Sequence, residues 1–532
     1  MFDSIRATRG MAVAPHALAA QSALHVLREG GNALEAMVAC SATIAVVYPH
    51  MNSIGGDSFW LLHVPGKAPG SIDASGAAAQ LASLDWYREH GVGAAIPFRG
   101  GLAANTIAGV VSGWAAALQL SRLLGGRLPL GRLLEDAIHY AEHGVAITQS
   151  QVMAVTGKQT ELRVQPGFAA TFLTDNTVPG NGQLLTQKKL AATLRRIAKA
   201  GPADFYRGEI AQAIAQDLAL TGSPIRLDDL RKHEARLRDP LVLAHSRGRI
   251  HNMAAPTQGL MALMILGILD QLKAHDLPPN SAEYIHLAVE ATKQAFRTRD
   301  AHVTDPAWMR TDAQEFLRTQ SLRDLAGRID RHRAAPWGAG GTPADTVWMG
   351  VIDGEGRAVS CIQSIYHEFG SGLVLPASGI NWQNRGCSFS LDPDARNPLT
   401  PFRKPFHTLN PALARFDDGR TLVYGNMGGD GQPQSQSAVF SRIALFGMNP
   451  QEAISAPRWL LGRTWGQTSD SLKLEARFPN ETVAALRAMG HEVDLMAPMD
   501  ETMGHAGAIV RHPNGLLEGA SDPRSDGAAA GW

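Results

Sequence analysis

The 532-residue sequence has only three cysteines, Cys40, Cys361 and Cys387, at wide and irregular spacing. An odd number of scattered cysteines excludes a disulfide framework and a CxxC metal site. Because disulfides are rare in reducing compartments, the lack of a disulfide framework favours a cytoplasmic location. The 19 histidines also lack an HExxH motif or any paired ligand spacing, so we expect neither a metal nor another cofactor.

The sequence also lacks a net charge, since its 49 basic residues are balanced by 49 acidic ones. Proteins that bind nucleic acid usually carry a basic excess, and those that bind anionic membranes need a polybasic cluster. No apolar run approaches the roughly 20 residues of a membrane-spanning helix, and the N-terminus lacks an apolar signal core. These absences leave a small molecule, or no charged partner at all, as the expected ligand class.

Two helices are expected near the N-terminus. Residues 16–28 carry apolar side chains at helical spacing, and the two glycines that follow are typical of a helix end. Asn32 with Glu35 three residues later has the pattern of a capping box. The second helix, which ends before Pro49, is apolar on nearly every side and is therefore predicted to be buried.

The remaining pattern changes character near residue 340. Residues 102–333 are mainly helical in pattern, and the Gly- and Pro-rich segment 334–343 is expected to be a flexible loop. Directly after it, residues 346–352 and 358–366 read as two strands joined by a turn. Later segments predict strands at 421–424 and 507–510 and helices at 436–446 and 480–489.

The junction between Asp345 and Thr346 places a loop before the start of a strand. A threonine hydroxyl becomes an effective nucleophile when a base stands beside it, and its own α-amine can serve once the preceding peptide bond is broken. A mobile loop ahead of a rigid strand suits such self-cleavage. The pattern alone is weak, because threonine begins many strands that have no catalytic function.

A second feature is the glycine-rich run that follows the strand at 421–424. Gly428 and Gly429 lie between this strand and a predicted helix, where backbone N–H groups are not covered by side chains. Such donors can stabilise the oxygen of a tetrahedral intermediate, assisted by the positive end of the helix. The run is not GxGxxG, so it does not indicate a dinucleotide site, and a plain turn is the alternative.

Several ordered blocks spread over nearly the whole chain resemble the γ-glutamyltranspeptidase family. They comprise residues 10–14, 27–36, 48–50, 55–59, 345–353, 369–372, 379–383, 428–429 and 519–524. The resemblance implies an α+β fold, a four-layer αββα sandwich, made from a precursor that cuts itself between Asp345 and Thr346. Residues 1–345 and 346–532 would then be the large and small subunits of one interwoven catalytic domain.

The resemblance also implies roles for individual residues. Thr346 matches the nucleophile of the family, and Ser364 matches the hydroxyl residue that hydrogen-bonds to it. Gly428 and Gly429 match the glycines whose N–H groups hold the oxyanion. No metal or organic cofactor is implied.

The expected substrate-binding residues depart from the glutamyl-specific pattern. Ser75 stands where those members carry an arginine for the α-carboxylate, and Tyr366 stands where they carry an asparagine. After Gln383, where an acidic residue would hold the α-amine, the chain has Asn384 and Arg385. The family's serine pair is replaced by His407 and Thr408.

A site that has lost an acid and gained an arginine should reject an ammonium group and accept an anion. We therefore expect a small amide or acyl compound that bears a carboxylate and no amine. Residues 383–386 resemble the branch of the family that hydrolyses oxamate to oxalate and ammonia. A surface or salt-bridged arginine is the alternative interpretation of Arg385.

Three other functions remain compatible with the sequence. The first is a γ-glutamyl hydrolase or transpeptidase, and the second is a cephalosporin-type acylase with a larger apolar pocket. The third is a catalytically silent binding protein of the same fold, against which the joint presence of Thr346, Ser364 and the two glycines argues. The expected partners are the small-molecule amide and the two cut chains with each other, with a homodimer left open.

Overall fold

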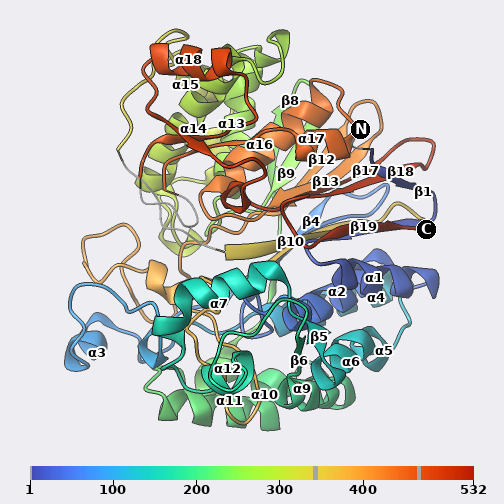
Figure 1. The fold of residues 1–532 in the computed structure, drawn as a ribbon, viewed down its shortest axis with the longest axis vertical. Coiled ribbons are helices and arrows are strands. Elements are labelled where there is room, and N and C mark those ends of the chain that lie inside the picture. Colours follow the sequence, from blue (N-terminus) through green and yellow to red (C-terminus); the bar gives the residue numbers. More distant parts are fainter. Residues whose placement is uncertain (1–2, 339–344, 464–468) are drawn as a thin grey trace.

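The computed structural model describes residues 3–338, 345–463 and 469–532. Two seven-stranded sheets face each other between two helical layers (Figure 1). The first sheet has the order β19 (Ala528–Gly531), β2 (Gly10–Ala14), β10 (Asp345–Asp353), β11 (Ala358–Tyr366), β3 (Asp57–His63), β4 (Gly70–Ala74) and β7 (Arg236–Arg238). The second has the order β1 (Ile5–Ala7), β18 (Leu517–Ser521), β17 (Ala506–Arg511), β13 (Thr421–Asn426), β12 (Ala412–Phe416), β9 (Gly248–Asn252) and β8 (Leu241–His245).

Helices cover the outer face of each sheet, so the expected αββα sandwich is confirmed (Figure 1). The layer on the first sheet includes α1 (Ala17–Arg28), α2 (Ala33–Val47), α4 (Val110–Leu123), α6 (Glu135–His143) and α9 (Lys188–Ala200). The layer on the second includes α13 (Gly259–Gln271), α14 (Ala282–His302), α15 (Thr319–Ala326) and α16 (Gly431–Ala444).

Shorter elements connect and flank these layers. They are α3 (Leu84–Glu89), α5 (Leu130–Leu133), α7 (Gln149–Leu162), α8 (Phe168–Phe172), α10 (Asp204–Arg207), α11 (Glu209–Leu220), α12 (Leu227–Lys232), α17 (Pro450–Ser455), α18 (Asn480–Ala488), the β5–β6 pair (Val145–Ala146, Leu184–Leu185) and the small sheet β14–β15–β16 (Trp459–Leu461, Leu472–Glu475, Val493–Met496).

Strand β10 contributes side chains to two separate hydrophobic clusters. Its side chains alternate in direction, as strand geometry requires. Val347, Met349 and Val351 pack into the cluster beneath α2, whereas Trp348 and Ile352 pack into the cluster between the two sheets. A central strand buried on both faces is held in one register, because a slip of one residue would exchange the two sets.

The indole of Trp348 fills the space between the sheets, where three glycines surround it. A Cβ atom added at Gly425 would lie 2.0 Å from Trp348 Cδ1, and one at Gly507 would lie 2.3 Å from Cζ3. Gly350 meets the indole from β10 itself, with 2.6 Å to Cη2. Trp348 Nε1 also donates a hydrogen bond to Ser360 Oγ at 2.9 Å. Gly425 and Gly507 face each other across β13 and β17, so the two strands form a flat surface for the indole.

Segments before and after Thr346 interleave in both sheets. In the first sheet, β10 and β11 lie between β2 on one side and β3 on the other. In the second, strands β12, β13, β17 and β18 lie between β1 and β9. Neither half of the chain therefore holds a complete sheet on its own.

Most elements lie where the sequence predicts them. The helix over residues 32–48 is α2, and all 15 of its residues are buried, with the capping box of Asn32 and Glu35 present. The strand pair around Gly354 is β10–β11. Residues 334–338 lack helix and strand structure, whereas residues 339–344 of the predicted flexible loop lie outside the described residues.

Local structure departs in detail from two of the predictions. The mainly helical middle region also contains strands β7, β8 and β9, which complete one edge of each sheet. The helix predicted at 436–446 is α16 and begins at Gly431, because Pro433 falls in its first turn, where proline is tolerated. Across the described residues, no helix is both long enough and apolar enough to cross a bilayer.

Replacing Gly507 with alanine is expected to lower the free energy of unfolding by about 1–3 kcal/mol or more, because the added methyl group overlaps the Trp348 indole. Chemical denaturation followed by tryptophan fluorescence measures the loss.

The control is Gly157→Ala in α7, where an added Cβ meets nothing within 4 Å. This helical substitution should stabilise the protein by about 0.5–1 kcal/mol. If both variants unfolded like the wild type, the tight contact between Trp348 and the glycines would be contradicted.

Candidate functional site

The predicted nucleophile lies where the ends of three neighbouring strands of the first sheet meet. Thr346 is the second residue of β10, Ser364 lies near the end of β11, and Asp57 begins β3. Ser364 pairs with Asp57 across the ladder, while the pairing between β10 and β11 shifts register between Asp345 and Val347. A bulge of this kind redirects side chains at a strand end. Thr346 therefore lies at an irregular point of an otherwise regular ladder.

The Thr346 side chain is buried and is contacted by an amide that the sequence did not single out. Gln432 Nε2 donates a hydrogen bond to Thr346 Oγ1 at 3.3 Å. Asn410 Nδ2 donates to Gln432 Oε1 at 3.1 Å and so fixes which end of this amide faces the threonine. Because Oγ1 accepts from Gln432, the proton of the hydroxyl is directed elsewhere.

Ser364 is also buried, and its hydroxyl oxygen accepts a hydrogen bond from the Tyr366 backbone N–H at 2.8 Å. Tyr366 has a positive φ of 84°, a rare conformation for a residue with a side chain. The serine hydroxyl thus supports a strained turn at the end of β11. Such strain often occurs at functional sites.

Gly428 and Gly429 join β13 to α16, and both adopt positive φ, 117° and 51°. The Gly429 carbonyl of this turn is held in place by Gln258, whose Nε2 donates to Gly429 O at 2.7 Å and also to Thr408 O at 2.9 Å. Among the described residues, the N–H groups of Gly428 and Gly429 have no hydrogen-bond acceptor. N–H groups without acceptors at the start of a helix favour a negatively charged partner, and the helix that follows, α16, has 14 residues.

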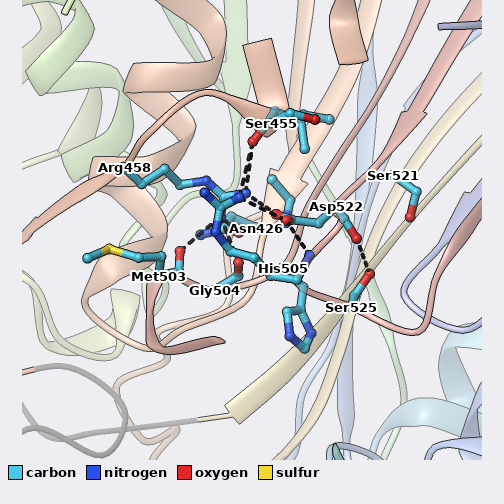
Figure 2. Close-up of polar contacts among 12 residues, drawn as sticks. Asn426, Ser455, Arg458, Met503, Gly504, His505, Ser521, Asp522 and Ser525 are labelled. Atoms are coloured by element: carbon cyan, nitrogen blue, oxygen red, sulfur yellow. Dashed lines mark hydrogen bonds and ion pairs between the residues drawn. The ribbon is translucent and has the colours of Figure 1, made fainter. Parts of the chain in front are cut away.

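Arg458 and Asp522 form a buried ionic network close to this turn, and Figure 2 shows the contacts of the two residues. Arg458 Nη1 donates to the carbonyl oxygens of Met503 at 2.9 Å and Gly504 at 2.6 Å. Gly504 packs against the turn, because a Cβ there would lie 2.2 Å from Met427 O. Asp522 accepts from Arg458 and from the Ala506 N–H at 2.7 Å.

The same network contains Asp522 and Arg524, two residues of the block at 519–524. Arg524 pairs with Glu475 at 2.6 Å and with Asp522 at 3.0 Å, and the side chains of all three are fully buried. The two arginines hold the pKa of Asp522 at about 2, against the effect of burial. Asp522 and Arg524, from the block at residues 519–524, are therefore part of the buried network next to the glycine turn.

Arg385 begins a short 3-10 turn and is buried, with its guanidinium 3.5 Å above the centre of the Tyr366 ring. Its Nη1 donates a long hydrogen bond to Thr408 Oγ1 at 3.4 Å, and its Nε has no acceptor in the described part of the chain. No ion pair joins it to a described carboxylate. Burial lowers its pKa, although a guanidinium stays protonated at neutral pH.

The other predicted binding residues lie on either side of Arg385 or farther away. Gln383 Nε2 donates to Ile107 O at 2.9 Å, and Asn384 Nδ2 donates to Phe98 O at 2.8 Å, so both amides hold neighbouring loops. Ser75 Oγ instead donates to Asp73 at 2.6 Å and accepts from Lys404 at 3.1 Å. Ser75 therefore contacts the ion pair between Asp73 and Lys404, and no hydrogen bond joins it to Arg385 or Tyr366 among the described residues.

One cluster, formed by two residues of α14 and one histidine near the C-terminal end of α18, has the residue types of a metal site. Ligand atoms of His286, Glu290 and His491 lie within 4.8 Å of one another. They already bond to each other and to neighbours, since His286 Nδ1 contacts His491 Nε2 at 2.8 Å and Glu290 pairs with Lys293 at 2.6 Å. Lys293 also donates to Ala335 O at 2.6 Å. The cluster therefore anchors the segment that leads toward Thr346.

Comparison with known proteins identifies the family. The sequence profile described as "Gamma-glutamyltranspeptidase" matches residues 19–532. The chain belongs to the γ-glutamyltranspeptidase family.

Two curated relatives and one solved structure illustrate its range. The chain is 58% identical to the oxamate amidohydrolase proenzyme of Klebsiella pneumoniae, covering 100% of both. It is 39% identical to the glutathione hydrolase-like YwrD proenzyme of Bacillus subtilis, again over 100% of both. The cephalosporin acylase of Bacillus halodurans superposes with a TM-score of 0.90 at 31% identity, covering 99% of this chain and 97% of that one.

Within this γ-glutamyltranspeptidase-family chain, sequence reasoning missed three residues of the site. Gln432 contacts Thr346, Gln258 holds the glycine turn, and Asp57 lies beside His407. Gln432 follows Gly429 by three residues, so its place in the first turn of α16 was a usable signal. Gln258 comes from a distant loop, and nothing in the sequence connects it to the turn.

Arg458→Met is expected to lower the free energy of unfolding by about 3–5 kcal/mol, because it leaves buried carboxylates without one of their cations. Urea denaturation measures the loss.

Arg88→Met removes an exposed arginine that pairs with Asp85 and should change stability by about 1 kcal/mol or less. Equal effects of the two substitutions would contradict a structural role for the network behind the glycine turn.

Proposed function

We propose that the protein is a self-processing N-terminal-threonine amidohydrolase that converts oxamate to oxalate and ammonia. The observation that carries the substrate assignment is the buried guanidinium of Arg385, which has no carboxylate partner among the described residues. Leaving such a charge unpaired costs stability unless a ligand supplies the anion. The 58% identity to a protein named oxamate amidohydrolase proenzyme supports the same assignment.

The proposed maturation begins with attack of Thr346 Oγ on the carbonyl carbon of Asp345. The peptide bond becomes an ester, and water hydrolyses it to a carboxylate at Asp345 and a free amine at Thr346. The proenzyme names of related proteins support this processing. The products are chains of residues 1–345 and 346–532, which stay together because their strands alternate in both sheets.

In the mature enzyme, the Thr346 amine is the proposed base that takes the Oγ proton. Gln432 holds Oγ1 in place by donating to it, so the hydroxyl proton can face the amine. Oγ attacks the amide carbon, and the N–H groups of Gly428 and Gly429 stabilise the negative oxygen that forms. Ammonia leaves, and water hydrolyses the acyl-enzyme to release the carboxylic acid.

In this proposal the carboxylate of the substrate lies on Arg385. The Tyr366 ring covers one face of the guanidinium and Thr408 contacts one edge, which leaves Nε and the rest of the edge for an anion. A guanidinium matches a planar carboxylate through two parallel hydrogen bonds. An α-amine on the substrate would approach the same cation and lose its hydrogen bonds, which costs about 1–3 kcal/mol.

The first test is the intact mass of the purified protein. Wild type should give two chains of roughly 37 and 20 kDa, in proportion to their lengths, the smaller beginning at Thr346. Thr346→Ala should remain a single 56.8 kDa chain.

Thr346→Ser is the control, because it keeps a hydroxyl and should still cut itself. A wild-type protein that never cuts would contradict the processing chemistry and favour a catalytically silent member of the family. Cleavage of the alanine variant at the same bond would exclude Thr346 as the nucleophile.

The second test compares ammonia release from oxamate with release from a γ-glutamyl amide. Wild type should act on oxamate, and Arg385→Met should lower kcat/KM by about 30-fold or more, since removing one partner of a buried ionic contact costs 2–5 kcal/mol.

Arg385→Lys keeps the charge and loses the planar contact, so it should fall between the two. Release from the glutamyl amide alone would overturn the role of Arg385 and indicate a γ-glutamyl hydrolase. Activity restricted to large acyl side chains would indicate an acylase.

A further inference from the structure

A short segment just before strand β12 contacts both the anion site and the predicted nucleophile. At one end of it, Thr408 Oγ1 accepts a hydrogen bond from Arg385 Nη1 at 3.4 Å. At the other end, Asn410 Nδ2 donates to Gln432 Oε1 at 3.1 Å, and Gln432 Nε2 donates to Thr346 Oγ1 at 3.3 Å. All of these residues are buried. Polar contacts therefore connect the proposed carboxylate-binding arginine to the threonine through this segment.

The direction of every hydrogen bond toward Thr346 is determined by one backbone carbonyl. The oxygen of Thr408 can only accept, and Asn410 Nδ2 donates to it at 2.9 Å. The same NH₂ group gives its second proton to Gln432 Oε1. The NH₂ end of Gln432 is then the end that faces Thr346 Oγ1. The hydroxyl oxygen of the threonine is thus made an acceptor by two amides in series.

The carbonyl at the start of this chain is itself held in place. Gln258 Nε2 donates to Thr408 O at 2.9 Å and to Gly429 O at 2.7 Å. The backbone carbonyl of Asn410 accepts from Gln436 Nε2 at 2.5 Å. The amides that lead to the nucleophile and the turn of the two glycines therefore share one fixed point.

The side chain of Asn410 uses only its donor group. It is fully buried, and its Oδ1 has no hydrogen-bond partner in the described part of the chain. An unpaired buried oxygen lowers stability, and an apolar side chain of similar shape would avoid that loss. The presence of an asparagine here is therefore better explained by what its NH₂ group does to Gln432 than by stability.

We propose that Asn410 is a positioning residue that sets the direction of the hydrogen bond on Thr346 Oγ1. With Gln432 donating, the hydroxyl proton can pass to a base when Oγ attacks a carbonyl carbon. This inference rests on the proposed role of Thr346 as the nucleophile and applies to self-cleavage and to amide hydrolysis alike.

The need for Asn410 follows from the shape of an amide. Turning the Gln432 amide over exchanges its oxygen and its NH₂ group with almost no change in volume, so packing does not select one orientation. Hydrogen bonds select it, because one end donates and the other accepts. Without the NH₂ group of Asn410, the Gln432 oxygen can face the threonine. The hydroxyl then donates its proton to Gln432, and that proton is no longer directed to the base.

The first test follows self-cleavage after a pulse of cell-free synthesis of the full chain. Asn410→Leu has a similar shape and lacks the NH₂ group, so it should slow cleavage before Thr346 by about 10- to 100-fold, part of what general base catalysis contributes. In the processed enzyme, kcat for ammonia release from oxamate should fall by a similar factor. KM should stay within about twofold, because Arg385 is unchanged.

A double substitution shows whether Asn410 acts through Gln432. Gln432→Met removes the hydrogen bond to Thr346 and should slow cleavage as much as Asn410→Leu or more. Adding Asn410→Leu to Gln432→Met should change the rate by less than about twofold, because residues that act through one contact are not additive. Two effects that multiply would overturn the role assigned to Asn410.

Gln432→Glu tests the direction of the hydrogen bond separately. A carboxylate only accepts, whereas a protonated carboxyl group can donate. Cleavage by this variant should be slow at about pH 8 and should recover toward pH 5, because burial favours the protonated form. Wild type should show no such recovery. A variant that cleaves like wild type at every pH would show that the direction does not matter.

Gln187→Met is the matched control for the loss of a buried amide. Gln187 is buried in the other helical layer, and its Nε2 donates to Val46 O at 2.8 Å. Its cleavage rate should equal that of wild type. Thermal unfolding shows whether each variant is folded. If Asn410→Leu does not fold, Asn410→Ala removes the same group without adding volume and takes its place.

The outcomes separate this inference from the proposed function. Wild type that cuts itself at the same rate as Asn410→Leu, with equal kcat in the two processed enzymes, would overturn the role of Asn410 and leave the proposed function intact. Wild type that never cuts would overturn Thr346 as the nucleophile, and the role of Asn410 with it.

Discussion

The contact between Trp348 and the glycines of the facing sheet determines where Thr346 lies. The indole is two residues from Thr346 on the same strand, and it enters a hollow that Gly425 and Gly507 leave open. Gly425 precedes the Gly428–Gly429 turn by only three residues. This contact between the sheets therefore couples the position of the threonine to that of the turn, because interiors as dense as organic crystals transmit small shifts.

Charge is distributed differently on the two sides of the glycine turn. Behind it, Arg458 and Arg524 oppose Asp522 and Glu475, so a fully buried network is internally neutral. In front of it, Arg385 is buried against an aromatic face and one hydroxyl. A completed network makes a rigid wall, whereas an incomplete one makes a site that gains stability when an anion enters. Buried arginines thus stabilise the glycine turn in the first case and, on the proposed function, bind the anionic substrate in the second.

Patterns that depend on neighbours in the sequence were predictable, and those that depend on distant segments were not. The capping box at Asn32, the all-apolar helix α2 and the hairpin after Thr346 follow from local spacing. Resemblance placed Thr346, Ser364 and the two glycines, whose chemical roles stay predictions. The amides of Gln432 and Gln258, and the pairing of Asp57 with His407, arise only when segments far apart in the chain come together. Strands β7–β9 were missed because most of the surrounding region is helical.

The alternation of early and late strands in both sheets has a consequence for quality control. Thr346 and the glycine turn reach their positions only when residues from both halves of the chain have assembled into the sandwich. On the proposed chemistry, a misfolded copy would never expose the amine and would stay inert. Activation would then report that folding is complete, and it would run in one direction, because two separated chains would each lack the strands that complete their sheets.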